Sequence, residues 1–382
     1  MQRSRQKILT THVGSLPRSD ALVELLVRKE EGDTSDAREF DVAVRHAVAD
    51  VVARQIALDI DVISDGEMSK INYATYVKDR LTGFADVDME PKILRDMRDF
   101  PALRRKMAML TGAQRFRRPG CVGSVAMRDR TALQKDIANL KDAVAARRAG
   151  EAFINAASPG VVASFLPNTY YPTHEAYIEA LAEVLREEYE AIAASGFLLQ
   201  IDCPDLAMSR HTVFQDLTEA EFLGRAALHV EALNHALRNV PIETVRIHIC
   251  WGNYEGPHTH DIELRRVIDI ALRAKAGAIS FEAANPRHGH EWAVWRDTRL
   301  PDDRFLLPGV IDTSTNFVEH PELVAQRIAQ FAAIVGRERV IASTDCGFGT
   351  SAGYGKIDPD VAYLKLDSLV KGAAIASARL WD

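Results

Sequence analysis

The sequence predicts an α/β fold, and within that class a single (β/α)8 TIM barrel. Short apolar or β-branched runs alternate with longer segments whose apolar residues recur at spacings of three and four. We count eight such alternations, the number that closes a parallel barrel. No G-x-G-x-x-G turn follows the first run, which argues against the doubly wound dinucleotide-binding fold. The 382 residues are therefore expected to form one domain, 1–382.

The N-terminal part begins the alternation and then interrupts it. The run ILTTHVGSL (8–16) predicts the first strand, and the pattern of 40–60 predicts an amphipathic helix. The second strand is expected near residue 63, in DVISDGE (61–67). The segment of about 86–158 does not keep this rhythm. We therefore predict an insertion there, between strands 2 and 3, with a hairpin in CVGSVAMRD (121–129).

The remaining strands follow at regular intervals. We assign the third strand to GVVASFLP (160–167), and we expect the amphipathic helix after it, 173–196, to end at Gly196. Thr218 and Glu221 have the spacing of a capping box at the start of a later helix. The last five strands are expected near residues 200, 248, 280, 308 and 342.

Charge and composition argue against several classes of partner. The net charge of −7 gives no basic field for nucleic acid, and the basic stretch 104–120 lies beside acidic residues in 84–100. No run of about 18 apolar residues predicts a membrane span, and the N-terminus lacks the apolar run of a signal peptide. Four cysteines are too few for a disulfide framework. We expect reduced thiols or metal ligands in a cytoplasmic protein.

Polar side chains stand at the carboxyl ends of several predicted strands, where barrel enzymes carry their chemistry. His248 and Cys250 are two residues apart in VRIHIC and share a strand face. Glu282 ends AISFE, and Cys346 ends VIASTDC. Because imidazole, thiolate and carboxylate are zinc ligands, we predict that these four side chains bind one Zn2+ ion. The alternative is that His248 is a core histidine with satisfied hydrogen bonds and that both cysteines are passive.

Two cysteines and a basic pair lie outside the predicted zinc set. Cys203 directly follows Asp202 and is expected to face away from it. Cys121 lies in the insertion, and we interpret both thiols as bystanders. Arg210 and His211 follow the same strand as Cys203. They either clamp an acidic group of the substrate or form a surface salt bridge.

Two loops carry pairs of histidines separated by one residue. GPHTHD holds His258 and His260, and NPRHGHEW holds His288 and His290. Such pairs suit a second metal ion. The competing interpretation is that they are polar loop residues at the mouth of the pocket.

A set of ordered motifs resembles the catalytic C-terminal barrel of cobalamin-independent methionine synthase. The motifs are THVGSLPR, DGEMSKINYATYVKDR, LQIDCPDLA, IHIC, ISFEAANP, PGVIDTSTN and STDCGFGT. They cover nearly the whole chain, and the resemblance implies zinc binding by the same four residues. It also implies contacts to an amino-acid substrate. Val13 and Ser15 would face the carboxylate through backbone and hydroxyl, and Glu67 and Asp202 would face the amine.

The chain departs from that family's pattern in ways that bear on the donor. The synthase has a second, N-terminal barrel and a long folate-facing apparatus, and neither is evident here. It also has a histidine after its PGV-D motif that helps to protonate the leaving folate nitrogen, where this chain has Thr313 and Ser314. A poor amine leaving group needs an acid, so this difference argues against methyltetrahydrofolate. The stretches HICWGNYEGPH, SRHTVFQDL and DTSTNFVEHPE instead resemble epoxyalkane:coenzyme M transferase, a single-barrel zinc relative.

Two functions follow from these resemblances. The first is a zinc-dependent thiol S-alkyltransferase similar to epoxyalkane:coenzyme M transferase (2-hydroxypropyl-CoM lyase), which activates a small thiol as a zinc thiolate for attack on an alkyl electrophile. The alternative is a methionine synthase-type methyltransferase, similar to 5-methyltetrahydropteroyltriglutamate–homocysteine S-methyltransferase or using a corrinoid donor, that makes methionine from homocysteine. Glu67 and Asp202 favour the alternative, because two carboxylates suit an amine-bearing thiol rather than a sulfonate.

Further residues and partners are predicted less directly. Tyr73 and Asp312 are the predicted catalytic residues, and Asn316 is a predicted substrate contact. Tyr73 would wall the pocket or donate a proton to an epoxide alkoxide, while Asp312 and Asn316 would orient the electrophile. The expected partners are a small-molecule thiol and an alkyl or methyl donor, without nucleic acid or membrane. A homo-oligomer is left open.

Overall fold

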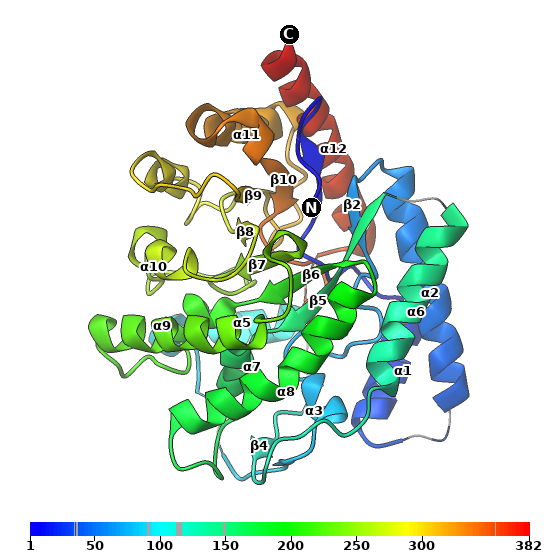
Figure 1. The fold of residues 1–382 in the computed structure, drawn as a ribbon, viewed down its shortest axis with the longest axis vertical. Helices are drawn as coiled ribbons and strands as arrows, with labels where there is room; N and C mark the ends of the chain where they lie inside the picture. Colours follow the sequence, from blue (N-terminus) through cyan, green and yellow to red (C-terminus); the bar gives the residue numbers. More distant parts are fainter. Residues whose placement is uncertain (34, 36, 90–91, 112–116, 148–149, 356) are drawn as a thin grey trace.

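The structure is a computed structural model that describes residues 1–33, 35, 37–89, 92–111, 117–147, 150–355 and 357–382. Within them, eight parallel strands form one sheet in the order β1-β10-β9-β8-β7-β6-β5-β2 (Figure 1). These strands are β1 (Leu9–Thr10), β2 (Val62–Ser64), β5 (Glu151–Ala157), β6 (Leu198–Asp202), β7 (Val245–Ile249), β8 (Ala278–Phe281), β9 (Phe305–Ile311) and β10 (Ile341–Thr344).

A side-chain contact joins the two ends of this sheet. Thr11, just after β1, donates through Oγ1 to the Val62 carbonyl of β2 at 2.9 Å. The sheet therefore curls into a nearly closed barrel, and the predicted (β/α)8 fold is confirmed.

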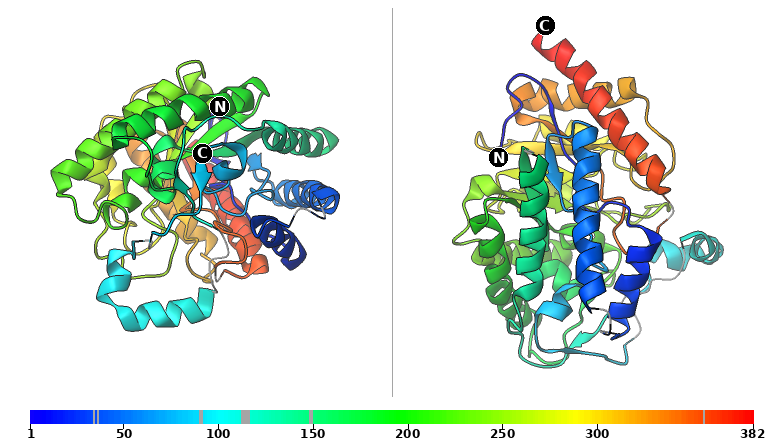
Figure 2. Two further views of the ribbon diagram at one scale, coloured as in Figure 1. Left: turned by 90° about the horizontal axis from the view of Figure 1, so that it is seen from below. Right: turned by 90° about the vertical axis from the view of Figure 1, so that its right-hand side faces the viewer.

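Helices connect the strands and cover the outside of the barrel (Figure 2). The main ones are α1 (Asp20–Glu30), α2 (Ala37–Ala57), α6 (Thr131–Arg147), α7 (Pro159–Phe165), α8 (His174–Ala194), α9 (Glu219–Ala236), α10 (Leu264–Ala271), α11 (Pro321–Val335) and α12 (Pro359–Trp381). As predicted, α8 ends just before Gly196, whose φ is +91°, and Thr218 with Glu221 forms a capping box on α9. Among the residues described, none of these helices combines the length and apolar composition needed to cross a bilayer.

The prediction for the third strand is wrong. Residues 160–167 belong mostly to helix α7, and the third barrel strand is β5, which pairs with β2 and β6. Ser158 caps α7 by accepting a hydrogen bond from Val161 N, and Pro159 occupies the first helical position. A short buried helix and a buried strand share the same apolar pattern, so only these end signals distinguish them.

The insertion between β2 and β5 is correspondingly shorter than 86–158, because α6 and β5 are barrel elements. It contains α3 (Val77–Arg80), β3 (Phe84–Ala85), α4 (Arg95–Asp99), α5 (Pro101–Thr111) and β4 (Gly120–Cys121). The predicted hairpin within 121–129 is wrong, since Cys121 pairs instead with Phe84 of the antiparallel strand β3. Figure 2 shows α4 and α5 standing out from the barrel. Parts of the insertion, 90–91, 112–116 and 148–149, lie outside the described residues, and with them part of the basic stretch.

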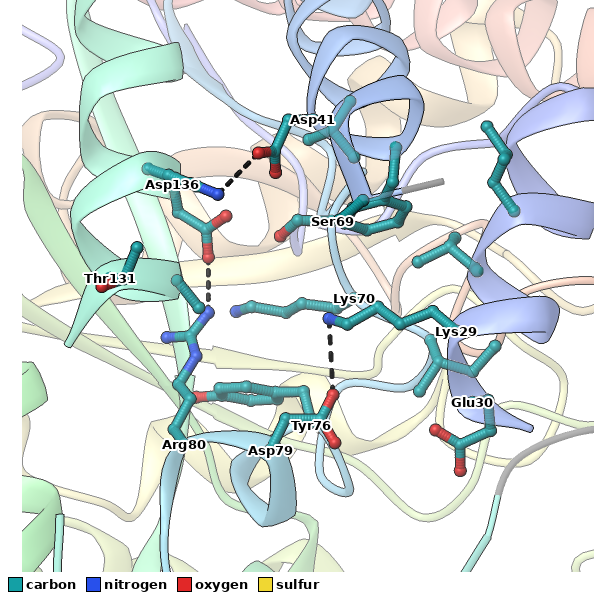
Figure 3. Close-up of a pocket in the computed structure, with 18 of the residues that line it drawn as sticks. Lys29, Glu30, Asp41, Ser69, Lys70, Tyr76, Asp79, Arg80, Thr131 and Asp136 are labelled. Atoms are coloured by element: carbon teal, nitrogen blue, oxygen red, sulfur yellow. Dashed lines mark hydrogen bonds and ion pairs between the residues drawn. The ribbon is translucent and has the colours of Figure 1, made fainter. Parts of the chain in front are cut away.

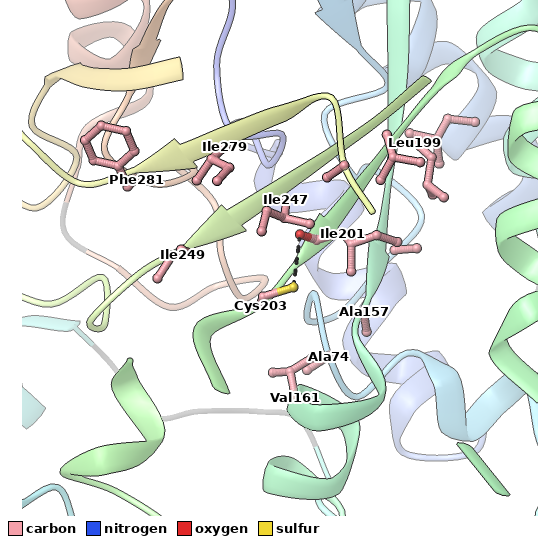
Figure 4. Close-up of a cluster of buried hydrophobic side chains, with 14 of the residues drawn as sticks. Ala74, Ala157, Val161, Leu199, Ile201, Cys203, Ile247, Ile249, Ile279 and Phe281 are labelled. Atoms are coloured by element: carbon pink, nitrogen blue, oxygen red, sulfur yellow. Dashed lines mark hydrogen bonds between the residues drawn. The ribbon is translucent and has the colours of Figure 1, made fainter. Parts of the chain in front are cut away.

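Alternation along the strands separates an apolar outer face from an inner face that is polar toward the carboxyl ends of the strands. Figure 4 shows apolar side chains of β6, β7 and β8, such as Ile201, Ile247 and Phe281, together in one buried cluster. Cys203 belongs to this cluster and donates through Sγ to the Ile201 carbonyl. Of the intervening residues of these strands, Leu198 and Ala278 are apolar, whereas those nearer the carboxyl ends are polar and build the mouth of the barrel: Gln200, Asp202, Arg246, His248 and Ser280.

Candidate metal centre

Three of the predicted zinc ligands converge at the carboxyl ends of the barrel strands. His248 lies on β7, Cys250 directly after it, and Cys346 after β10, and one ligand atom of each lies within 4.8 Å of the others. Glu282 follows β8 and places Oε1 at 3.6 Å from Cys346 Sγ. All four side chains are buried. We call these four residues the metal half of the barrel mouth.

Hydrogen bonds hold the metal half in place. His248 Nδ1 lies 3.1 Å from Ser280 Oγ, which leaves Nε2 for another ligand. Glu282 accepts through Oε1 from Trp251 N and through Oε2 from Asn285 Nδ2, both at 2.7 Å. Partners of this kind fix the orientation of metal-binding side chains.

The electrostatics of the metal half suit a cation. Burial lowers the pKa of His248 to about 3, so the ring is a neutral imidazole with a lone pair to offer. Burial also raises the pKa of Glu282, and together with the neighbouring Cys250 it raises the pKa of the Cys346 thiol. A bound divalent cation reverses this trend by favouring the anionic forms. Two sulfurs, one nitrogen and one oxygen are a donor set that fits zinc.

Asp345 holds the loop that carries Glu282 of the metal half. Its carboxylate accepts hydrogen bonds at 2.8 Å from the backbone N–H groups of Ala283, Ala284 and Asn285, so it fixes the loop that carries Glu282. Burial, with the nearby charge of Glu282, raises the pKa of Asp345 to about 7.

Two buried carboxylates form a second group at the same mouth. Asp202 ends β6 and accepts from Gln200 Nε2 at 2.9 Å and from Asn155 Nδ2 at 3.0 Å. Glu67 follows β2 in a left-handed conformation, φ +58°, which is strained for a glutamate. Its Oε2 atom is buried and has no hydrogen-bond partner among the described residues. Burial raises the pKa of Asp202 to about 6 and, with the charge of Asp202, the pKa of Glu67 to about 7.

Val13 and Ser15 complete this carboxylate half, which we define as Val13, Ser15, Glu67 and Asp202. Val13 N donates to Thr344 Oγ1 at 3.2 Å, and the Val13 carbonyl accepts from Asn155 Nδ2 at 2.9 Å. Ser15 Oγ accepts from Gly349 N at 3.3 Å. Val13 therefore contacts the end of β10, and Ser15 contacts the segment that follows it.

Of the other predicted residues, Tyr73 lies near the barrel mouth, whereas the side chains of Asp312 and Asn316 bond to nearby backbone groups. Tyr73 packs edge-on against Phe165, and burial with the nearby charges of Cys250 and Asp202 raises its pKa, so its phenol lies near both halves. Asp312 instead accepts hydrogen bonds from the backbone and hydroxyl groups of Ser314 and Thr315. Asn316 is exposed and accepts from Asp358 N.

Several residues inside the barrel that hydrogen-bond the side chains and backbone groups of its mouth were not identified from the sequence. Arg246 is 1% exposed and donates to Gln200 Oε1 and Thr11 Oγ1. It shares a strand face with His248, so alternation along β7 was a usable signal. Asn155, which contacts both Val13 and Asp202, was hidden by the wrong assignment of the third strand.

A separate cavity of about 310 Å³ lies between α1, α2, α6 and the segment after β2 (Figure 3). It contains none of the predicted site residues. Several of its charged groups are already paired, since Arg80 bridges Asp136 and Glu188, and Lys70 Nζ donates to the Asn155 carbonyl. We assign no chemistry to this cavity.

Comparison with known proteins gives a consistent result. Residues 8–93 and 161–358 match the family described as cobalamin-independent synthase, catalytic domain. The methionine synthases of Sulfolobus acidocaldarius and Thermococcus kodakarensis are each 24% identical over 97% of this chain, and the match covers 93% and 94% of those proteins. A B12-independent methionine synthase from a Shewanella species has the same fold, with a TM-score of 0.74 at 20% identity over 98% of this chain and 99% of that one. The chain therefore belongs to the cobalamin-independent synthase catalytic domain family.

Proposed function

We propose that the protein is a zinc-dependent methyltransferase, a single barrel that makes methionine from homocysteine. The observation that carries this proposal is the position of the carboxylate half beside the metal half. Glu67 has a buried oxygen that no described residue hydrogen-bonds, and it lies near Asp202, so it suits a cationic group of a substrate whose sulfur would lie at the cysteines. Homocysteine has an ammonium group and a thiol in one short molecule.

The metal half would hold zinc through His248, Cys250, Glu282 and Cys346. Zinc at this position would lower the pKa of a substrate thiol and so supply a nucleophile at neutral pH. The protein's own contribution is orientation, since Ser280 and Trp251 each hold one of these side chains. In the reaction a bond forms between the homocysteine sulfur and the methyl carbon, the bond from that carbon to the donor breaks, and the thiol proton leaves to solvent.

The carboxylate half would hold the amino-acid part of the substrate. Glu67 and Asp202 would accept hydrogen bonds from the ammonium group, and Ser15 with the Val13 backbone would lie toward the carboxylate. The Shewanella synthase was solved in complex with selenomethionine, an amino acid close in size to the expected product, which supports an amino-acid substrate for this chain. Tyr73, near both halves, would close the pocket around the substrate.

The epoxyalkane:coenzyme M transferase function is the weaker candidate. A sulfonate placed beside Glu67 and Asp202 would meet two carboxylates of its own sign. The relatives reported above are methionine synthases rather than coenzyme M transferases. We therefore prefer homocysteine as the thiol.

The methyl donor is expected to leave without protonation, as a methylated corrinoid does. Thr313 and Ser314 stand where the synthase has its histidine, and their hydroxyls donate to Asn253 Oδ1 and to Asp312 Oδ1. Neither is an acid strong enough for an amine leaving group. We assign Asp312 to holding this turn, and Asn316 to the start of α12 through Asp358, rather than to the electrophile.

A panel of thiols and donors tests the function. Zinc-loaded protein is incubated with homocysteine, coenzyme M or glutathione, each with methylcobalamin, methyltetrahydrofolate or epoxypropane, and products are identified by mass spectrometry. We expect methionine from homocysteine and methylcobalamin, with the Glu67→Gln variant as the low-activity control. Turnover only with coenzyme M and epoxypropane would overturn the proposal. Equal turnover with methyltetrahydrofolate would refute the donor assignment alone.

A further inference from the structure

A second buried cluster lies on the loops that follow β6, β7 and β8. It consists of His211, His258, Asp261 and His288, and we call it the histidine cluster. His258, Asp261 and His288 each offer a ligand atom within 4.8 Å of the other two. His211 approaches from the far side, with Nδ1 at 3.2 Å from Asp261 Oδ1. Three imidazoles thus surround one carboxylate.

The hydrogen bonds of this cluster balance only if His258 and His288 each carry two protons, or if a metal ion takes the place of one proton on each ring. His258 Nε2 faces the Tyr254 carbonyl at 3.0 Å, and His288 Nδ1 faces Glu291 Oε2 at 2.8 Å, so both of these nitrogens must carry hydrogen. The opposite nitrogens, His258 Nδ1 and His288 Nε2, both point at Asp261 Oδ2, at 2.7 and 2.9 Å. Two rings would each need a second proton in order to share one oxygen.

His211 supplies an independent observation. Its side chain is 1% exposed, and in the described part of the chain neither ring nitrogen has a hydrogen-bond partner. Asp261 Oδ1, which His211 faces, also has none. Leaving a buried polar group unsatisfied costs about 1–3 kcal/mol. His211 Nδ1 and Asp261 Oδ1 lie 3.2 Å apart without the geometry of a hydrogen bond, so in a neutral His211 both keep a lone pair that a cation beside them could use.

We infer that His211, His258, Asp261 and His288 form a second site for a divalent metal ion. Three imidazoles and a carboxylate suit zinc and its first-row neighbours. Bonds of about 2.0–2.1 Å separate tetrahedral ligand atoms by roughly 3.3 Å, so the donors of His258, Asp261 and His288 need to open only slightly. His211, which lies beside the other oxygen of Asp261, would have to move toward this group to become the fourth ligand. Binding replaces one proton on His258 Nδ1 and one on His288 Nε2, and two protons leave to solvent.

The surroundings of the histidine cluster match those of a metal site. After those protons leave, His258 and His288 would still donate through their outer nitrogens to the Tyr254 carbonyl and to Glu291. Metal-binding histidines are usually held in this way. The site would also be distinct from the metal half in its chemistry, since it contains no sulfur.

A cation here would tie together three loops beside the metal half. Trp251 packs against His288 with ring centroids 4.2 Å apart and ring planes tilted by 30°, and Trp251 N donates to Glu282 Oε1. We therefore expect the ion to have a structural role, keeping Trp251 and hence Glu282 in position. This inference does not depend on the proposed function.

Metal stoichiometry and cobalt spectra test the inference. Metal-free protein is titrated with Co2+, which gives a strong thiolate charge-transfer absorption in the metal half and only weak ligand-field bands in the histidine cluster. We expect the wild-type chain to bind two equivalents and the Cys250→Ser/Cys346→Ser variant to bind one, without charge transfer. The His258→Gln/His288→Gln variant should bind one, with charge transfer.

The His260→Gln variant is the matched control, because His260 lies in the same loop but outside the cluster, where it pairs with Asp99. It should bind two equivalents. A double-cysteine variant that is folded by circular dichroism and binds no metal would overturn the inference. If that variant does not fold, the wild-type titration decides. A second equivalent without added charge transfer supports the site, and saturation at one equivalent overturns it.

Discussion

The buried glutamates of the two halves of the barrel mouth, Glu282 and Glu67, differ in how completely they are hydrogen-bonded. In the metal half, Glu282 already has both oxygens hydrogen-bonded, and Ser280 occupies one nitrogen of His248. In the carboxylate half, an oxygen of Glu67 remains without a partner among the described residues, on a backbone held at positive φ.

Under the proposed function, this difference would separate a residue that binds a permanent metal ion from one that binds a transient substrate. Side chains whose other contacts are complete are ready for an ion that stays bound. A strained, unsatisfied carboxylate carries a cost that is relieved only when a substrate arrives. If this contrast is correct, substitutions in the metal half should reduce zinc binding, whereas substitutions in the carboxylate half should weaken homocysteine binding.

The largest effect is expected from Cys346→Ser. Loss of a thiolate ligand should abolish zinc binding and lower kcat/KM by about 10³-fold or more, roughly 4 kcal/mol of transition-state stabilisation. Metal analysis and methionine formation measure the two effects. Cys121→Ala, in the insertion, should retain both zinc and activity. A Cys346→Ser protein with full zinc and full activity would show that this sulfur is not a ligand.

Glu67→Gln should damage the carboxylate half without touching the metal half. We expect zinc to be retained and kcat/KM for homocysteine to fall by about 10²-fold, mostly through KM, because a charged hydrogen bond to the ammonium group is lost. Steady-state kinetics with varied homocysteine measures the split. An unchanged KM would mean that Glu67 does not hold the amine.

Asp345→Asn should weaken the hydrogen bonds that position the loop carrying Glu282. The loop that carries Glu282 loses charge-assisted acceptors for its N–H groups, and zinc affinity should fall by about 10–100-fold. Competition with a chromophoric chelator gives the affinity. Equal affinity in the two proteins would show that Glu282 keeps its position without this support.

The smallest effect concerns pH. Because burial raises the pKa of Glu67 to about 7, its carboxylate form increases between pH 6 and 8, and KM for homocysteine should fall a few-fold over that range. The Glu67→Gln variant should lack this dependence. A KM that does not change with pH in the wild-type protein would break the proposed contrast.

The raised pKa of Glu67 affects stability in the opposite direction: raising the pH should improve homocysteine binding but lower the free energy of unfolding. The folded pKa of Glu67, about 7, lies above the ordinary value of 4.5, so its contribution to stability is complete below pH 4.5 and is lost as pH rises through 7. At pH 8, Glu67→Gln should therefore be more stable than the wild-type protein by about 1–3 kcal/mol. Chemical denaturation at pH 5 and pH 8 measures the difference.

Much of the fold was predictable because it depends on local pattern. The capping box of Thr218 and Glu221 and the helix end at Gly196 need only neighbouring residues, and both were found. The third strand was missed because the apolar run 160–167 fits a helix or a strand equally well. The choice was decided by Ser158 and Pro159, which start the helix.

The metal half was predictable for a different reason. Residues at the carboxyl ends of parallel strands must meet at one rim, so His248, Glu282 and Cys346 could be brought together from strand order alone. Asp312 and Asn316 also follow a strand, yet their side chains bond to their own turn and to the start of α12. Side-chain direction after a strand ends is set by the loop, and strand order gives no information about it.

The irregular end of β10 would have to be reproduced in any design that moves the four candidate metal ligands to another protein. The register shifts between Ser343 and Thr344, and the next two residues then serve different partners, with Asp345 on the loop after β8 and Cys346 in the metal half. Gly309 lies opposite Ser343, and a methyl group at this position would clash with Asp345 Oδ1. A designer who grafts only the ligands onto another scaffold would deliver the last sulfur at the wrong angle. The design would need to include the β10 irregularity and Gly309 together with Cys346.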